Sequence, residues 1–117
     1  VYSMAKNMVI AGDYKNKPIG STMKYLTIKT GFRKSVPISK ETVETYEIVD
    51  EEHRTKAMSA IGRGMVGSLA LGPAGLLAGL SAKKKKTYLV AIKFKDGKES
   101  LIEMNNIMYK HLVQTLF

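Results

Sequence analysis

The chain has 117 residues, 44% of them hydrophobic, and a formal net charge of +9. This length predicts one domain with a small core. The absence of cysteine excludes a disulfide framework and a thiolate metal site, and it favours a cytoplasmic protein. Residues 1–40 and 83–98 are basic, whereas residues 41–52 carry six acids and no base. This pattern favours an anionic partner such as nucleic acid, nucleotide, lipid headgroup or an acidic protein face, with a merely solvated surface as the alternative.

Strands are predicted along the first part of the chain. Residues 6–18 begin as a strand and run into a polar turn. Residues 23–31 alternate polar and apolar side chains, which predicts a half-buried strand. Residues 34–39 and 41–49 indicate two more strands, and Pro37 suggests an edge or a strand start.

After residue 49 the hydrophobic period becomes helical. Asp50 can cap a helix, and the two glutamates that follow it lie where a helix N-terminus favours negative charge. The pattern predicts a helix through about Leu71, stopped by Gly72-Pro73. Residues 74–83 predict a second short helix, so that residues 50–82 would form a Gly-rich helical hairpin.

Residues 87–104 predict two strands around Asp96-Gly97, a dipeptide that suits a two-residue type I′ turn. In the first of these strands, one face is expected to carry Tyr88, Val90, Ile92 and Phe94. Residues 105–117 predict an amphipathic helix capped by Asn105 or Asn106. Its apolar stripe comprises Met108, Tyr109, Leu112, Val113 and Leu116.

This order of elements predicts a single α+β domain over residues 1–117. Residues 1–49 and 83–117 would form the sheet and the C-terminal helix, with the helical hairpin inserted between strands. The sheet would be strongly bent and antiparallel, or closed into a barrel like that of pleckstrin-homology domains. The run GPAGLLAGLSAKKKKTYLVAIKFKDGKESLIEM also resembles a family of small proteins from Gram-positive bacteria and their phages that have a pleckstrin-homology-like domain and a Gly-rich apolar insertion. That resemblance implies no activity.

The apolar insertion allows three interpretations. Residues 64–82 carry no charge over 19 positions, which is long enough to span a membrane, but Gly72-Pro73 divides them into two short arms. Small residues recur every four positions, which favours a close helix–helix seam. The favoured interpretation is an oligomer core, with a lid on the same chain and insertion into a membrane as alternatives. The predicted oligomer seam consists of Gly64, Ser68, Gly72, Gly75 and Gly79.

No catalytic constellation is visible, so we expect no enzymatic activity, no cofactor and no metal. His53 and His111 are isolated from other metal-ligating residues. Glu99 and Glu103 are expected to pair with lysines across the hairpin rather than to act as an acid–base pair.

The best binding candidate is the lysine run, for which a solubilising linker is the alternative interpretation. The predicted anion-binding residues are Lys83, Lys84, Lys85, Lys86 and Arg63.

The sequence therefore predicts a non-enzymatic, self-associating module that binds an anionic ligand or an acidic protein surface. If it is encoded by a phage or another mobile element, inhibition of a host defence component is the expected use. One alternative is a peripheral membrane protein that inserts the apolar hairpin beneath a lysine collar. A second alternative is a non-specific nucleic-acid binder.

Overall fold

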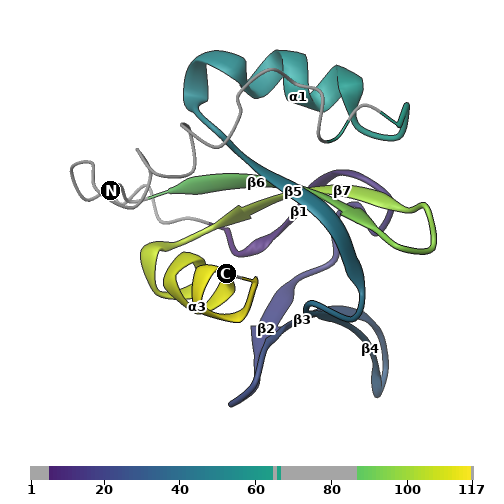
Figure 1. Ribbon diagram of the computed structural model, residues 1–117, viewed down its shortest axis with the longest axis vertical. Coiled ribbons are helices and arrows are strands. Elements are labelled where there is room, and N and C mark those ends of the chain that lie inside the picture. Colours follow the sequence, from purple (N-terminus) through teal and green to yellow (C-terminus); the bar gives the residue numbers. More distant parts are fainter. Residues whose placement is uncertain (1–5, 65, 67–86, 117) are drawn as a thin grey trace.

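The computed structural model describes residues 6–64, 66 and 87–116. They form an α+β domain with two antiparallel sheets and a C-terminal helix (Figure 1). The larger sheet has the strand order β1-β7-β6-β5 and the smaller one the order β2-β3-β4. The larger sheet comprises β1 (Met8–Gly12), β5 (Val43–Val49), β6 (Tyr88–Phe94) and β7 (Glu99–Met104). The smaller sheet comprises β2 (Ile19–Ser21), β3 (Leu26–Gly31) and β4 (Lys34–Ile38).

The two sheets do not close into a barrel in the described part of the chain, which corrects the barrel expectation. Near the join, a single bridge connects Met8 to Pro18 outside the named strands. Two backbone hydrogen bonds flank this bridge, from the amide of Val9 to the carbonyl of Lys17 and from the amide of Ile19 to the carbonyl of Asn7, and the pairing goes no further. The bent sheet of the prediction is thus divided into two hydrogen-bonded sheets that share one core.

The main core lies between the two sheets and α3 (Asn106–Leu116). Alternate residues of β6 enter it, as predicted, and Tyr88 stacks on Tyr109 with ring centroids 3.9 Å apart. The predicted cap is confirmed, because Asn105 Oδ1 accepts a hydrogen bond from the amide of Met108 at 2.9 Å. The predicted stripe on α3 is also confirmed, since all five of its members are buried or packed against this core.

A second, smaller core lies on the opposite face of the larger sheet, beneath η1 (Glu51–His53) and α1 (Arg54–Ala60) (Figure 1). Asp50 caps the first turn as expected, with Oδ1 accepting from the amide of His53 at 3.1 Å. Many of the side chains here are small, which lets α1 approach the sheet closely. Most of this core is formed by Ala11, Val49, Ala57, Ala60, Ile61, Val66, Leu89, Ala91 and Leu101.

The helix that begins after Asp50 is shorter than predicted. It ends at Ala60 rather than near Leu71, because Gly62 and Gly64 have φ angles of +86° and +74° and turn the chain. The second arm of the predicted hairpin falls within residues 67–86, which lie outside the described residues.

The β6–β7 turn differs from the predicted type. Gly97 has the expected positive φ, at +93°. However, the amides of Phe94 and Gly97 bond to the carbonyls of Lys98 and Phe94 respectively, so the loop contains three residues, with Asp96 at its centre. A three-residue loop places its left-handed residue last, which explains why the glycine follows the aspartate.

Candidate functional site

Residues 14–40 carry the smaller sheet and the connections on either side of it, and this stretch of the chain has no acidic residue. It contains seven basic residues. All seven are exposed, and none forms an ion pair with a carboxylate in the described part of the chain. We call this set the basic surface: Lys15, Lys17, Lys24, Lys29, Arg33, Lys34 and Lys40. Lys29 and Lys34 lie on strands and the other five lie in turns and connections, and exposed cations without a paired carboxylate create a positive potential that attracts anions.

Lys29 is held over the outer face of the smaller sheet. It follows Ile28, which enters the core, so its own side chain points to the solvent side. Gly20 lies on the neighbouring strand and leaves room for it, since a Cβ atom on Gly20 would stand 2.6 Å from Lys29 Cε. The missing side chain therefore lets the lysine stem lie along the sheet.

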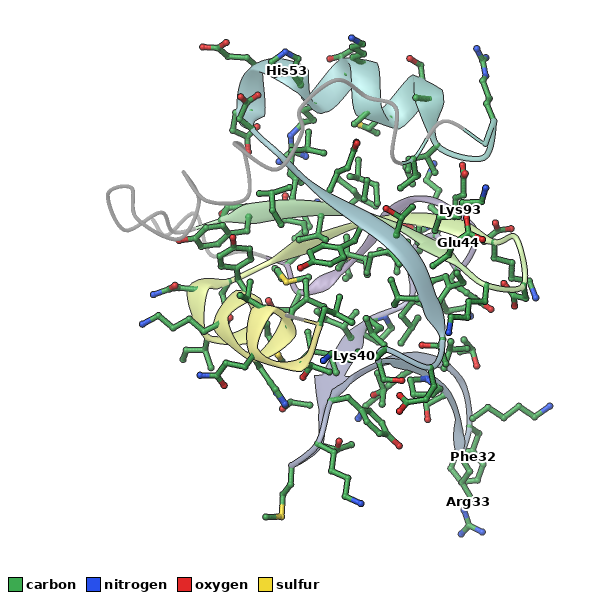
Figure 2. All side chains as sticks on the ribbon, viewed as in Figure 1. Phe32, Arg33, Lys40, Glu44, His53 and Lys93 are labelled. Atoms are coloured by element: carbon green, nitrogen blue, oxygen red, sulfur yellow. The ribbon has the colours of Figure 1, made fainter. Side chains whose placement is uncertain are left out.

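The β3–β4 turn projects from the sheet and ends in an exposed aromatic side chain. Phe32 is 88% exposed. The guanidinium of Arg33 lies over its ring, 5.2 Å from the centroid, and Arg33 itself has a φ of +60°. Figure 2 shows both side chains pointing away from the body of the molecule. An apolar ring and a cation are thus presented together at one tip.

The β2–β3 turn presents a second exposed apolar side chain. Met23 is fully exposed, and Lys24 follows it. The turn itself is ordered by Thr22, whose hydroxyl donates to the carbonyl of Tyr25 at 2.8 Å and accepts from the amides of Lys24 and Tyr25. The geometry of the turn is therefore fixed locally, without any contact from the methionine.

A shallow hollow of about 370 Å³ opens beside this turn, between the β4–β5 connection and the end of α3. Two lysines at its rim belong to the basic surface. A carboxylate also lies there: the hydroxyl of Ser39 is the main cause that lowers the pKa of Glu41, so this group is ionised at neutral pH. An anion in the hollow would meet Glu41, so the hollow suits an anion less well than the open sheet does. Its lining comprises Lys24, Tyr25, Ser39, Lys40, Glu41 and Thr115.

Charge is unequal at the two ends of the longest axis. The turns of the smaller sheet lie at one end, and η1 and α1 at the other (Figure 1). Residues 50–64 carry three acids and three bases, so their charges cancel. Along β5, Glu44 is paired with Lys93 at 3.4 Å. The described residues therefore have a strongly positive end and an electrically balanced one.

Glu99 occupies an anion-binding turn inside the protein. It is 2% exposed, and its Oε1 accepts from the amides of Gly62 and Gly64 at 2.7 and 3.1 Å. The turn after α1 is therefore a concavity of backbone N–H groups whose occupant is a carboxylate of the chain itself. The glycine-rich start of the insertion is not a free phosphate cradle.

Glu103 also has partners other than the predicted lysines. Its two oxygens accept from Arg54 Nη2 at 3.0 Å and from the amide of Lys6 at 2.9 Å. Arg54 makes two further hydrogen bonds to Glu51, and the two carboxylates raise its pKa above the ordinary value. The sequence interpretation was wrong for Glu99 and Glu103, because α1 covers the face of β7 on which they lie.

Two of the predicted binding and seam residues lie in the described part. Arg63 is exposed in the turn after α1. Gly64 lies in that same turn and not on the face of a helix that continues from Ala60. The others lie outside the described residues, and they are Ser68, Gly72, Gly75, Gly79, Lys83, Lys84, Lys85 and Lys86. Self-association and the lysine site therefore stay predictions.

The described residues form neither a metal site nor a membrane-spanning helix. Among the described residues, no three metal-ligating side chains group in a way that would hold an ion. The helices in that same part of the chain are too short or too polar to cross a bilayer. His53 bonds to Asp50, and His111 Nδ1 lies 3.1 Å from Ser21 Oγ.

No protein-family model, curated protein or solved structure matches this chain. The resemblance to pleckstrin-homology-like proteins of Gram-positive bacteria and phages therefore stays a prediction.

The sequence interpretation missed Phe32 and Met23. It treated aromatic and apolar residues mainly as core material. A signal was available, because Phe32 follows a glycine and falls between two predicted strands, where a turn is required. An apolar side chain in a turn is directed away from the core.

Proposed function

We propose that this chain is a non-enzymatic binding module that holds an anionic partner on the basic surface. The observation that carries the proposal is the run of seven exposed cations without an acid over residues 14–40. Three of them, Lys29, Arg33 and Lys34, lie on β3, β4 and their common turn. Binding of this kind is electrostatic, so its affinity falls as salt rises.

The proposal is tested by isothermal titration of the full chain with inorganic polyphosphate at low and at physiological ionic strength. The test variant replaces Lys29, Arg33 and Lys34 by glutamine. We expect it to bind about tenfold more weakly or worse, since each exposed cation near an anionic surface contributes about 1 kcal/mol.

The matched control replaces three exposed lysines outside the basic surface by glutamine, which changes the net charge equally. These are Lys56, Lys95 and Lys110. We expect the control to lose less than the test variant. Equal losses would mean that net charge alone governs binding, and the basic surface would then not be a site.

The lysine run and Arg63 are a second anion-binding set in this proposal. Replacing Lys83, Lys84, Lys85 and Lys86 together by glutamine should leave the fold intact, because Tyr88 and Val90 are packed in the main core. It should weaken polyphosphate binding further when combined with the first variant. Unchanged binding would reduce the run to a solvated linker.

We further propose that the module self-associates through the small-residue seam. Light scattering in detergent-free buffer should give one discrete oligomer. Aggregation that only detergent or vesicles relieve would favour insertion of residues 64–82 into a membrane instead. A role against a host defence component, by contact with an acidic protein face, stays a prediction from the sequence.

A further inference from the structure

Two large apolar side chains stand in solvent at the turns of the smaller sheet. Met23 and Phe32 are 101% and 88% exposed. The two turns that carry them point to the same end of the longest axis (Figure 1). The tip with Phe32 and Arg33 is the outermost labelled part of that end in Figure 2. Single exposed apolar residues are ordinary, but these two lie on the turns at the two ends of β3, and both turns point to the same end of the molecule, so one flat partner can meet both.

Each of the two apolar tips has cations beside it. Lys24 follows Met23, while Arg33 and Lys34 follow Phe32. Arg33 stays within 5.2 Å of the Phe32 ring centroid, so its charge is held close to the apolar tip. A short apolar projection with cations at its base matches the interface of an anionic bilayer, where apolar atoms enter below the headgroups and the cations meet the phosphates.

We infer that the anionic partner of the basic surface is a phospholipid bilayer, which Phe32 and Met23 enter while the surrounding cations bind its headgroups. This inference rests on the proposed function and names its partner. Within the described part of the chain, the unequal charge of the two ends supports it, because an anionic plane would attract the end with the turns and leave η1 and α1 directed away.

Single-stranded nucleic acid fits the same cations less well. Binding without sequence preference relies on aromatic rings that are free to stack on successive bases. In the described residues, Tyr88, Phe94 and Tyr109 are buried in the core, and one face of the exposed Phe32 is covered by Arg33. The other aromatic side chain beside the smaller sheet, Tyr25, is half-buried in the lining of the hollow, so the described residues offer no row of free rings for successive bases.

The test is sedimentation of the full chain with phosphatidylcholine vesicles that contain or lack phosphatidylserine. The variant is Phe32→Ser combined with Met23→Ser. The control is Ile107→Ser, which removes an apolar side chain that is 77% exposed near the start of α3 and belongs to neither turn. All three positions are exposed, so the variants should keep the wild-type melting temperature and circular dichroism spectrum.

We expect the wild type to bind vesicles with phosphatidylserine and to bind plain phosphatidylcholine weakly. The double serine variant should lose about tenfold in vesicle affinity, because two apolar side chains no longer leave water. Its polyphosphate affinity should change less than twofold, since no cation is lost. The Ile107→Ser protein should bind vesicles like the wild type.

If the double serine variant binds vesicles as tightly as the wild type, the inference is overturned. The proposed function would still stand in that case, provided that the triple glutamine variant binds polyphosphate more weakly than the wild type. Tighter binding to a single-stranded oligonucleotide than to the anionic vesicles, weakened by Phe32→Ser, would also overturn the inference in favour of nucleic acid. Absence of binding to polyphosphate and vesicles alike would remove the proposed function itself.

Discussion

The carboxylate of Glu99 accepts a hydrogen bond from the amide of Gly62 at 2.7 Å, across 37 residues of chain. The same oxygen accepts from Gly64, while Oε2 is buried without a hydrogen-bond partner among the described residues. One side chain of β7 thus fastens the turn that follows α1. The contact fixes where α1 ends.

Glu99→Ala should destabilise the fold by about 3 kcal/mol, because it removes two hydrogen bonds to a carboxylate and leaves a cavity. Glu99→Gln should cost less than half as much, since its amide oxygen can still accept from both glycines. Urea unfolding curves measure the difference. Equal stability of the two variants would show that the hydrogen bonds contribute nothing.

Gly12→Ala should be among the most damaging single-methyl additions. Gly12 has a φ of +87°, and an added Cβ would lie 2.3 Å from Ile61 Cγ2 and 2.4 Å from the carbonyl oxygen of Glu99. We expect a loss of about 3 kcal/mol, from overpacking and from backbone strain together. Thermal unfolding would check this.

Gly31→Ala is the matched control. Gly31 has no positive φ, and the nearest atoms to an added Cβ belong to Lys34, at 3.8 Å. The change in stability should stay within about 0.5 kcal/mol. A loss as large as that of Gly12→Ala would contradict the packing argument.

Alkaline pH should destabilise the protein through Tyr109. Burial raises the pKa of Tyr109 to about 12, with smaller effects from Tyr88 and Tyr46. The unfolded chain has a tyrosine pKa of about 10 and gives up this proton first. The contribution of the protonated Tyr109 to the free energy of unfolding is therefore complete below pH 10. It is lost as pH rises toward 12, by up to about 1.4 kcal/mol per pH unit.

Tyr109→Phe isolates that effect. The variant keeps the ring that stacks on Tyr88 and removes a hydroxyl that is buried without a hydrogen-bond partner in the described structure. We expect unchanged or higher stability at neutral pH. Between about pH 10 and 12 the stability advantage of the variant over the wild type should grow. If the free energies of unfolding of the two proteins fall in parallel between about pH 10 and 12, Tyr109 is not the cause of the alkaline destabilisation.

Gly75→Leu or Gly79→Leu should lower the assembly state, because a close helix seam has no room for a branched side chain. Both positions lie outside the described residues, so this prediction depends on the four-residue spacing in the sequence alone. Light scattering gives the molar mass. A leucine variant with the wild-type mass and melting temperature would contradict the seam.

Most helices and strands could be predicted because their apolar residues recur with the spacing of a strand or a helix. The strands of the larger sheet and α3 follow such patterns. The strand β2 was missed, because Ile19–Ser21 is too short for any alternation and contains a glycine. The end of α1 was also missed, since the helical spacing continues past Ala60 while Gly62 and Gly64 turn the backbone.

Side-chain partners were harder to predict than elements. Lys93 lies opposite Glu99 in the β6–β7 register, which made a cross-strand ion pair the natural expectation. Instead, the packing of α1 over that face buries Glu99 and brings Gly62 to it. Sequence pairing rules describe an open sheet, and they do not show which face another layer will cover. The exposed position of Phe32 was not predicted for a related reason, because hydrophobicity alone does not distinguish a core residue from one at the tip of a turn.

The strand order of the larger sheet also governs when the protein can fold. β1 pairs with β7, and the amide of Asn105 bonds to Asn7 Oδ1 across 98 residues of sequence. Contacts of such separation must overcome a large loop-closure entropy before they stabilise anything, which slows folding. β2, β3 and β4 can pair with one another as soon as they are synthesised, but β1 has only its local bridge to Pro18 until residues 99–104 have left the ribosome. We therefore expect the fold to be completed only after translation of β7, with the apolar face of β1 needing protection until then.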